Sequence, residues 1–290
     1  MTDQIRNIPV LGRFMRVRIA GDPSKPTVLM LHGVTRSLDD WDLQFDELAD
    51  QFHLIAPDMP GYGWSAPHPD GAGLAALARG VGELLDVLDL RDPVHVVGNS
   101  LGGAVTMTLL TQRPELVASM TLLDPAGFGS EVTPLLRLLG IPVIGKIAAT
   151  TASLPSAIIQ ERLVYTDKSF ATRKRIQHAL TIARETNAGL TSWRTVAELG
   201  SFFSGVSAQW RTELLTAVAE YDRPMLVVWG DNDKVLPPSH LAAAAIALPK
   251  ARTTLIPGIG HMPHIECAPE CAALISDVVT GSITSGASTP

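Results

Sequence analysis

The sequence predicts an α/β fold in which a mostly parallel sheet is covered by helices on both faces. First, the strand-like segments are almost continuously apolar, as expected for strands buried on both faces. Second, these segments alternate with helical ones, which is typical of parallel sheets. Third, 46% of the 290 residues are hydrophobic and 18% are charged, so the chain can fill a sizeable core of one large domain or two small ones.

The predicted elements follow one another along the chain. Short apolar runs predict strands at residues 16–20, 27–31, 54–56, 94–97, 120–123, 225–229 and 253–256. Helical periodicity or alanine-rich composition predicts helices at residues 74–90, 101–112, 239–248 and 268–280. The tail that follows, residues 281–290, is rich in serine, threonine and glycine, and we expect it to be flexible.

One long interval, residues 126–222, breaks the alternation. It is largely helical, contains no convincing buried strand, and is divided in its first half by Pro134, Pro142 and Pro155. We expect it to form a helical cap over the carboxyl edge of the sheet, where open α/β sheets bind ligands. Residues 1–125 and 223–280 then form the core domain. An independent helical domain elsewhere on the surface is the alternative.

Charge and composition narrow the function classes. The net charge is −6 and the pI about 5.7, so the chain as a whole has no electrostatic signature for nucleic acid or anionic lipid. Cys267 and Cys271 lie one helical turn apart and predict two buried thiols rather than a disulfide. The N-terminus lacks the apolar stretch of a secretory signal, and the apolar residues 135–154 are interrupted by charges and prolines. We therefore expect a cytoplasmic protein with no membrane span.

The sharpest motif is GNSLG at residues 98–102, between a predicted strand and a predicted helix. In a Gly-x-Ser-x-Gly turn the serine adopts a strained backbone, and Gly98 and Gly102 allow close packing around it. Ser100 would then present its hydroxyl above the sheet as a nucleophile. The amide of Leu101, at the start of the helix, would face the developing oxyanion. A glycine-rich helix start with an idle serine is the structural alternative.

A second motif supports the first. The strand at residues 27–31 ends in His32-Gly33-Val34, and the Val34 amide can supply the other oxyanion donor. We expect His32 to hold this loop in place rather than to transfer protons.

A serine nucleophile needs a base and an orienting acid. His261 follows the last predicted strand on a Gly-flanked loop, which puts it at the same edge of the sheet as Ser100. The other histidines fit less well, and His264 is its main competitor. Asp231 and Asp233 share one loop after the strand at residues 225–229. Asp124 ends a neighbouring strand, and spacing alone does not rank these carboxylates.

These motifs together resemble the α/β-hydrolase fold family over residues 10–125 and 223–280. The order Ser100, Asp233, His261 matches the family's order of nucleophile, acid and base. The sequence GDNDKVLP at residues 230–237 is similar to the family's acid motif and favours Asp233, and GH at 260–261 is similar to its histidine motif. The loop DMPGYGWS at 58–65 resembles a structural loop of the family. The resemblance implies a helical cap inserted after the sixth strand.

The expected chemistry is acyl transfer to water through a covalent acyl-enzyme. His261 takes the proton of Ser100, the amides of Val34 and Leu101 hold the oxyanion, and Asp233 fixes the imidazole. This chemistry requires neither a metal nor an organic cofactor. Apolar cap residues could line a hydrophobic acyl pocket, and we expect about a third of them to do so. They are Leu135, Leu136, Leu138, Leu139, Ile141, Val143, Ile144, Trp193, Phe202, Phe203 and Trp210.

The first interpretation of function is therefore a hydrolase of hydrophobic carboxylic esters. Hydrolysis of a carbon–carbon bond is the runner-up, because GNSLGG resembles the elbow of meta-cleavage-product hydrolases. The loop HGVTRS and the Met262 that follows His261 depart from those enzymes and favour an esterase. A lactonase fits the same triad, whereas Ser100 disfavours a dehalogenase or epoxide hydrolase, whose relatives use Asp.

Two other classes remain. One is a non-catalytic ligand receptor on the same fold. The other interprets His261, His264 and Glu266 as metal ligands, which we rank lowest because no further ligand cluster is evident. The expected partner is a small hydrophobic substrate, and the sequence leaves a homodimer open.

Overall fold

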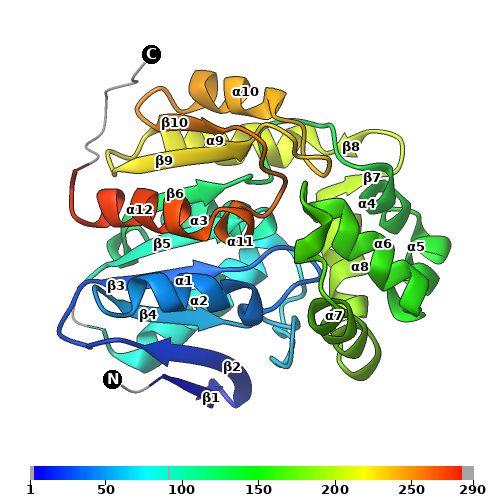
Figure 1. Cartoon of the computed structure of the whole chain (residues 1–290), viewed down its shortest axis with the longest axis horizontal. Helices are drawn as coiled ribbons and strands as arrows, with labels where there is room; N and C mark the ends of the chain where they lie inside the picture. Colours follow the sequence, from blue (N-terminus) through cyan, green and yellow to red (C-terminus); the bar gives the residue numbers. More distant parts are fainter. Residues whose placement is uncertain (1–2, 91, 283–290) are drawn as a thin grey trace.

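A computed structural model describes residues 3–90 and 92–282, and one eight-stranded sheet lies at its centre (Figure 1). The strand order is β1-β2-β4-β3-β5-β6-β9-β10. The pairs β1–β2 and β2–β4 are antiparallel, and the other pairs are parallel. The strands are β1 (Gln4–Val10), β2 (Arg13–Ala20), β3 (Thr27–Leu31), β4 (His53–Pro57), β5 (Val94–Asn99), β6 (Val117–Leu123), β9 (Met225–Gly230) and β10 (Arg252–Ile256).

Both faces of the sheet are buried. Successive side chains of each central strand point to opposite faces and pack into two apolar layers. In β3, Leu29 and Leu31 pack into one layer, and Val28 and Met30 into the other. The first layer lies under α2 (Leu74–Leu88), α3 (Leu101–Gln112), α9 (Ala208–Ala219) and α10 (Ser239–Ala247). The second lies under α1 (Asp42–Leu48), α11 (Pro263–Glu266) and α12 (Ala268–Val279).

The structure confirms the predicted fold class. The observed bounds of each predicted strand and core helix differ from the expected ones by a few residues at most. The strand β1 and the helix α1 were missed. In β1 most side chains are exposed, so this edge strand lacks the continuous apolar pattern of the buried strands. Of the predicted tail, residues 283–290 lie outside the described residues.

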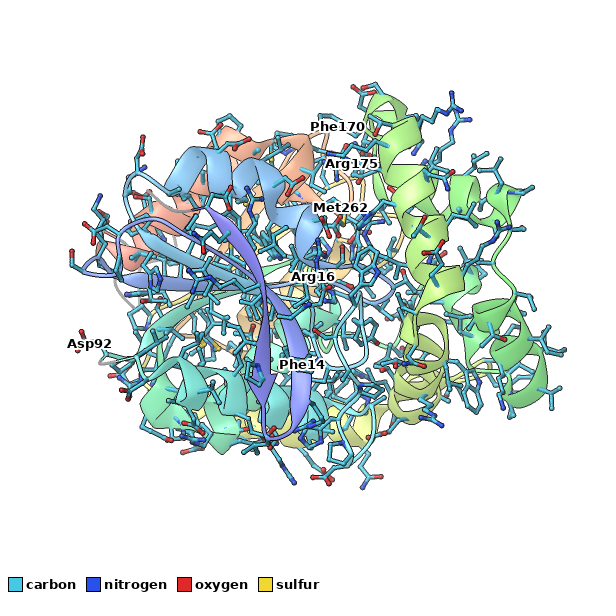
Figure 2. All side chains as sticks on the ribbon, turned by 90° about the horizontal axis from the view of Figure 1, so that it is seen from below. Phe14, Arg16, Asp92, Phe170, Arg175 and Met262 are labelled. Atoms are coloured by element: carbon cyan, nitrogen blue, oxygen red, sulfur yellow. The ribbon has the colours of Figure 1, made fainter. Side chains whose placement is uncertain are left out.

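The interval after β6 forms a group of helices beside the sheet (Figure 1). Its elements are α4 (Pro134–Leu139), α5 (Pro142–Thr150), α6 (Leu154–Val164), α7 (Arg173–Glu185), α8 (Ala188–Leu199), β7 (Gly200–Ser201) and β8 (Gly205–Val206). Figure 2 shows Arg175 and Met262 where these helices meet the core, and Asp92, which precedes β5, at the opposite end. The helices α4–α8 therefore cover the carboxyl ends of the parallel strands.

Within the described residues, no single helix is long and apolar enough to cross a membrane. The helices α5 and α6 reach the required length and hydropathy only together, and they meet at a bend of 98°.

The order of the strands also identifies the point of the sheet edge at which ligands of such folds bind. β3 pairs with β4 on one side and with β5 on the other, so the direction of strand addition reverses between β3 and β5. Ligands of open α/β sheets bind outside the carboxyl ends of the strands at such a reversal. The loops after β3 and β5, which contain Val34 and Ser100, lie at this point.

Candidate active site

Ser100 stands on a strained turn between β5 and α3. Its φ of 54° and ψ of −115° are rare for a residue with a side chain. The turn is held tightly, because a Cβ on Gly98 would lie 2.4 Å from the Gly102 carbonyl oxygen, and one on Gly102 would lie 2.1 Å from the Leu31 carbonyl oxygen. Only glycine fits at either position, which explains the spacing of the motif physically.

The predicted oxyanion donors lie on either side of this serine. Leu101 is the first residue of α3, so its amide has no partner inside the helix. Val34 and Leu101 line one cavity together with Ser100. His32 holds the loop: its Nε2 accepts from the Met59 amide at 3.0 Å, so its Nδ1–H donates to the Gly33 carbonyl oxygen at 2.8 Å. Burial lowers the pKa of His32, which keeps it neutral.

His261 is brought to the same site by its loop. Its Nδ1 lies 2.7 Å from Oδ2 of Asp233, and the ring lines a cavity that also contains Ser100. Its backbone amide donates to the Val164 carbonyl oxygen at the end of α6. The Asn99 side-chain amide donates to the His261 carbonyl oxygen at 3.0 Å. This role of Asn99 is not predictable from the sequence pattern, because its position and that of His261 are 162 residues apart and only the fold brings them together.

The structure separates the two carboxylates that spacing could not rank. Asp233 is buried, and its Oδ1 accepts from the amides of Val235 and Leu236 at 2.7 and 3.1 Å, which leaves Oδ2 for His261. Asp231 turns the other way and accepts from the Gly258 amide at 2.7 Å. Asp233 is therefore the carboxylate that can orient the imidazole through Nδ1–H.

Asp124 adds a second buried carboxyl to the site. It has a φ of 44°, and its Oδ1 accepts from the Gly230 amide at 2.9 Å. Carboxylate oxygens of Asp124 and Asp233 and a ring nitrogen of His261 all lie within 4.8 Å of one another. Burial, and then the neighbouring Asp233 charge, hold the pKa of Asp124 well above its usual value. We interpret the Asp124 carboxyl as protonated.

The competing histidine, His264, lies in a different environment. It is fully buried, neither ring nitrogen has a hydrogen-bond partner within the described part of the chain, and its ring centroid is 4.3 Å from that of Trp41. Glu266 accepts instead from the backbone amides of Gly260, Thr166 and Asp167. The residues of the lowest-ranked metal hypothesis are thus not brought together, and the cluster with ligand geometry is Asp124, Asp233 and His261.

The burial of His264 predicts a pH dependence of stability. Desolvation lowers its pKa to about 3, whereas in the unfolded chain the pKa is near 6.5. Below about pH 6.5 the unfolded state therefore binds a proton that the folded state refuses, and stability falls by up to about 1.4 kcal/mol per pH unit. His264→Phe keeps a ring against Trp41. Between pH 7 and pH 5 we expect its free energy of unfolding to fall by about 2 kcal/mol less than that of the wild type.

Urea unfolding of both proteins at the two pH values measures this difference. Other buried histidines contribute equally to both proteins, so the comparison isolates His264. Equal losses of stability in the two proteins would refute the assignment.

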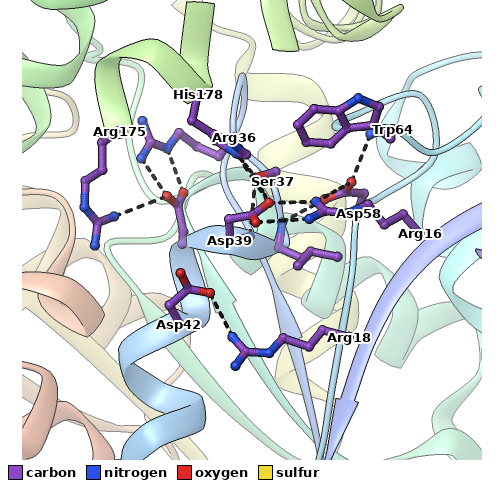
Figure 3. A network of polar contacts seen from close by, with 12 residues as sticks. Arg16, Arg18, Arg36, Ser37, Asp39, Asp42, Asp58, Trp64, Arg175 and His178 are labelled. Carbon is purple, nitrogen blue, oxygen red and sulfur yellow. Dashed lines mark hydrogen bonds and ion pairs between the residues drawn. The ribbon is translucent and has the colours of Figure 1, made fainter. Parts of the chain in front are cut away.

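A network of ion pairs connects the loop after Val34 to the cap helices (Figure 3). Arg36 forms two hydrogen bonds with Asp40, at 2.6 and 2.7 Å, and pairs with the buried Glu161 of α6. From α7, Nε2 of His178 lies 2.9 Å from Oγ of Ser37. The loop that follows Val34 is thereby held by α6 and by α7. An oxyanion site needs a loop that is fixed before the substrate binds.

Two cavities meet at Ser100. The first is apolar, and Val196 and Leu199 of α8, Val206 of β8 and Trp210 of α9 line it. The second lies on the side of His261 and continues between the cap helices. Of the apolar cap residues singled out from the sequence, those that line these cavities are Leu135, Leu136, Leu138, Leu139 and Trp210, whereas Val143, Ile144 and Phe203 are exposed.

The chain is similar to known proteins over most of its length. Residues 28–274 match the family described as alpha/beta hydrolase. The chain is 31% identical over 255 residues to the dihydrolipoyllysine-residue acetyltransferase component of the acetoin cleaving system of Cupriavidus necator, covering 88% of this chain and 64% of that protein. It is 28% identical over 265 residues to lipase 1 of Psychrobacter immobilis, covering 88% and 75%.

Solved structures show the same fold. A protein assigned as a lipase from Acinetobacter baumannii superposes with a TM-score of 0.81 at 21% identity, over 97% of this chain and 93% of that one. A meta-cleavage product hydrolase from Pseudomonas fluorescens gives a TM-score of 0.78 at 20% identity, over 96% and 98%. From its fold and from the match across most of its length, the chain belongs to the alpha/beta hydrolase family.

Proposed function

We propose that this protein is a serine hydrolase of carboxylic esters with a hydrophobic acyl group. The observation that carries the proposal is the shared cavity of Ser100 and His261, with Nδ1 of that histidine 2.7 Å from a buried Asp233. Because Nδ1–H is committed to Asp233, the Nε2 lone pair is available to accept the proton of Ser100. Lipase relatives such as that of Psychrobacter immobilis support the same reaction class.

The reaction proceeds in two halves. Ser100 Oγ attacks the ester carbonyl carbon as His261 takes its proton, and the amides of Val34 and Leu101 donate to the oxyanion. His261 then gives the proton to the departing alcohol. A water molecule, activated by the same imidazole, attacks the acyl-enzyme, and the acid leaves as the proton returns to Ser100.

The two cavities divide the substrate. The leaving alcohol must lie beside His261, because that residue protonates it, so the second cavity receives the alcohol part. The acyl chain then occupies the apolar cavity on the side of Leu101, lined by Val196 and Leu199. The largely apolar lining of this cavity suits a hydrocarbon chain, although Arg137, Thr195 and Ser201 also line it.

Filling the acyl cavity should change chain-length preference. We expect Val196→Phe to lower kcat/KM for long-chain p-nitrophenyl esters about tenfold or more while acetate ester hydrolysis changes little, because overpacking costs about 1–3 kcal/mol. The matched control is Ala183→Phe on α7, which fills the alcohol side and should keep the acyl-length profile. If both variants shift the profile alike, the division of the cavities is wrong.

A substrate panel tests the function itself. The proposal predicts that p-nitrophenyl esters are hydrolysed and that their rates depend on acyl length. A dienone carbon–carbon substrate and an acyl lactone, measured beside them, represent the runner-up activities. Turnover of the dienone alone would overturn the ester assignment in favour of carbon–carbon hydrolysis. If no member of the panel is hydrolysed and the serine is unreactive, the protein is a ligand receptor.

A further inference from the structure

The outer side of the cap carries an exposed apolar surface on α5 and α6. We define the α5–α6 surface by Val143, Ile144 and Ile147 on α5 and by Leu154 and Ile159 on α6, whose exposed fractions are 70, 54, 56, 48 and 60%. Figure 1 shows α5 on the side of the cap that faces away from the sheet, whereas α6 runs back to the core. Val143, Ile144 and Ile147 lie close together on α5 by helical spacing, and such exposed apolar side chains mark a contact surface.

The charge of this region is opposite to that of the rest of the chain. Residues 132–184 contain eight lysines and arginines but only two acidic residues, a net charge of +6. The whole chain carries −6, so the remainder carries −12. The total charge considered in the sequence analysis hides this separation. One of the two acidic residues, Glu161, is buried against Arg36 and does not offset the cations at the surface.

The cations lie among the apolar side chains. Lys146 is exposed on α5 and, by helical spacing, shares a face with Val143, three residues before it. Arg162 is exposed on α6, three residues after Ile159. Neither cation forms an ion pair within residues 3–90 and 92–282. Nζ of Lys146 lies 5.7 Å from the centroid of the Trp193 ring, a contact that leaves its positive charge in place. Exposed apolar side chains interspersed with cations that form no ion pair are the pattern of helices that lie in the interface of an anionic membrane.

Other residues of α5 and α6 line a cavity that adjoins the active site. A cavity of about 280 Å³ is lined by Ala148 and Ala149 of α5 and by Ser153 and Ser156 at the start of α6. It shares Thr35, Leu135, Leu136 and Gln160 with the cavity that contains Ser100 and His261. The helices that carry the α5–α6 surface thus also line a cavity next to that of the nucleophile.

We propose that the α5–α6 surface docks on anionic lipid surfaces, with its apolar side chains in the headgroup region and Lys146 and Arg162 at the phosphates. A second copy of the chain fits less well, because a two-fold contact would place two surfaces of net positive charge against each other. Docking goes beyond the proposed esterase activity and does not depend on it. The electrostatic part should weaken as salt rises.

Vesicle co-sedimentation of the full chain tests the proposal. With the Ser100→Ala protein, which leaves any ester bond intact, we expect binding to phosphatidylcholine vesicles containing about one quarter phosphatidylglycerol, and at least about tenfold weaker binding to pure phosphatidylcholine or in high salt. Val143→Ser/Ile147→Ser and Lys146→Glu/Arg162→Glu should each lose at least about tenfold in affinity.

The matched control changes an exposed isoleucine of α10 and a lysine in the turn after it, Ile246→Ser/Lys250→Glu, outside the cap, and should bind as well as the parent protein. In the Ser100→Ala background, all variants should keep the urea midpoint of the parent protein. Restored to Ser100, they should keep the wild-type rate on a water-soluble acetate ester.

Equal binding by the surface variants and the control would overturn the proposal, as would absence of binding to anionic vesicles. Sedimentation velocity distinguishes the other occupant: a dimer that the α5–α6 variants convert to monomer, without vesicle binding, would assign the surface to a second copy. Loss of ester hydrolysis with intact vesicle binding would refute the proposed function and leave the docking surface standing.

Discussion

Ser100→Ala should lower kcat for ester hydrolysis by roughly 10⁴-fold or more, with little change in stability. The hydroxyl is the atom that bonds to the substrate, so no neighbouring group can replace it. The strained φ of 54° belongs to the backbone and is equally strained with alanine, so the urea midpoint should stay near that of the wild type. Steady-state kinetics on a p-nitrophenyl ester measures the loss.

Cysteine at position 100 is a useful second variant, because it keeps a nucleophile of similar size. We expect it to react with an activated ester but to turn over slowly, since the geometry around His261 is set for oxygen. A near wild-type rate for the alanine variant would contradict the nucleophile assignment, because the oxyanion donors alone leave only a small residual rate.

The two buried carboxyls should differ sharply in their effect on catalysis. Asp233→Asn replaces the group 2.7 Å from His261 Nδ1 and should lower kcat by about 10⁴-fold, because the amide favours the wrong imidazole tautomer. Asp124→Asn is the matched control, since the protonated carboxyl that it replaces is already neutral. Its amide oxygen can still accept from Gly230, and we expect a loss of less than about tenfold.

The pair also predicts a change in pH dependence. Removing the Asp233 charge relieves Asp124 of its repulsion, so the pKa of Asp124 should fall, while burial, the larger cause, still holds it above the usual value. The residual activity of Asp233→Asn should then rise with pH as Asp124 ionises, and the double variant Asp124→Asn/Asp233→Asn should lack that rise. Comparable damage from Asp124→Asn alone would mean that Asp124, not Asp233, is the acid of the triad.

The fold could be predicted from the sequence because the central strands are buried on both faces. Their continuous apolar runs do not depend on which neighbours each side chain contacts. β3 shows this in its alternate residues, which fill opposite layers. The strand β1 escapes the same reasoning, because its largely exposed residues carry no apolar pattern and its pairing with β2 depends on the hairpin between them.

The candidate site was predictable where local backbone geometry dictates sequence. The close approaches at Gly98 and Gly102 leave no room for a Cβ, and the serine between them must lie on a sharp turn. Sequence spacing alone could not decide between Asp231 and Asp233. Two residues apart on one loop, they differ only in the hydrogen bonds that the folded turn makes.

The surface of the cap was the least predictable part. Val143 and Ile144 are as apolar as residues that line the cavities, and only packing decides which side of a helix faces inward. Helical periodicity could have suggested an amphipathic α5, but its partner helices are unknown until the chain is folded. Likewise, a net charge of −6 says nothing of how the charges are distributed.

Active-site labelling tests the central claim most directly. A fluorophosphonate bonds to a serine only where a base and an oxyanion site activate that serine. We predict one label per chain, located by peptide mass spectrometry on Ser100, and labelling that is at least about 10²-fold slower when His261 is replaced by alanine. A label on another residue, or labelling of Ser100 at an unchanged rate without the imidazole, would contradict the account.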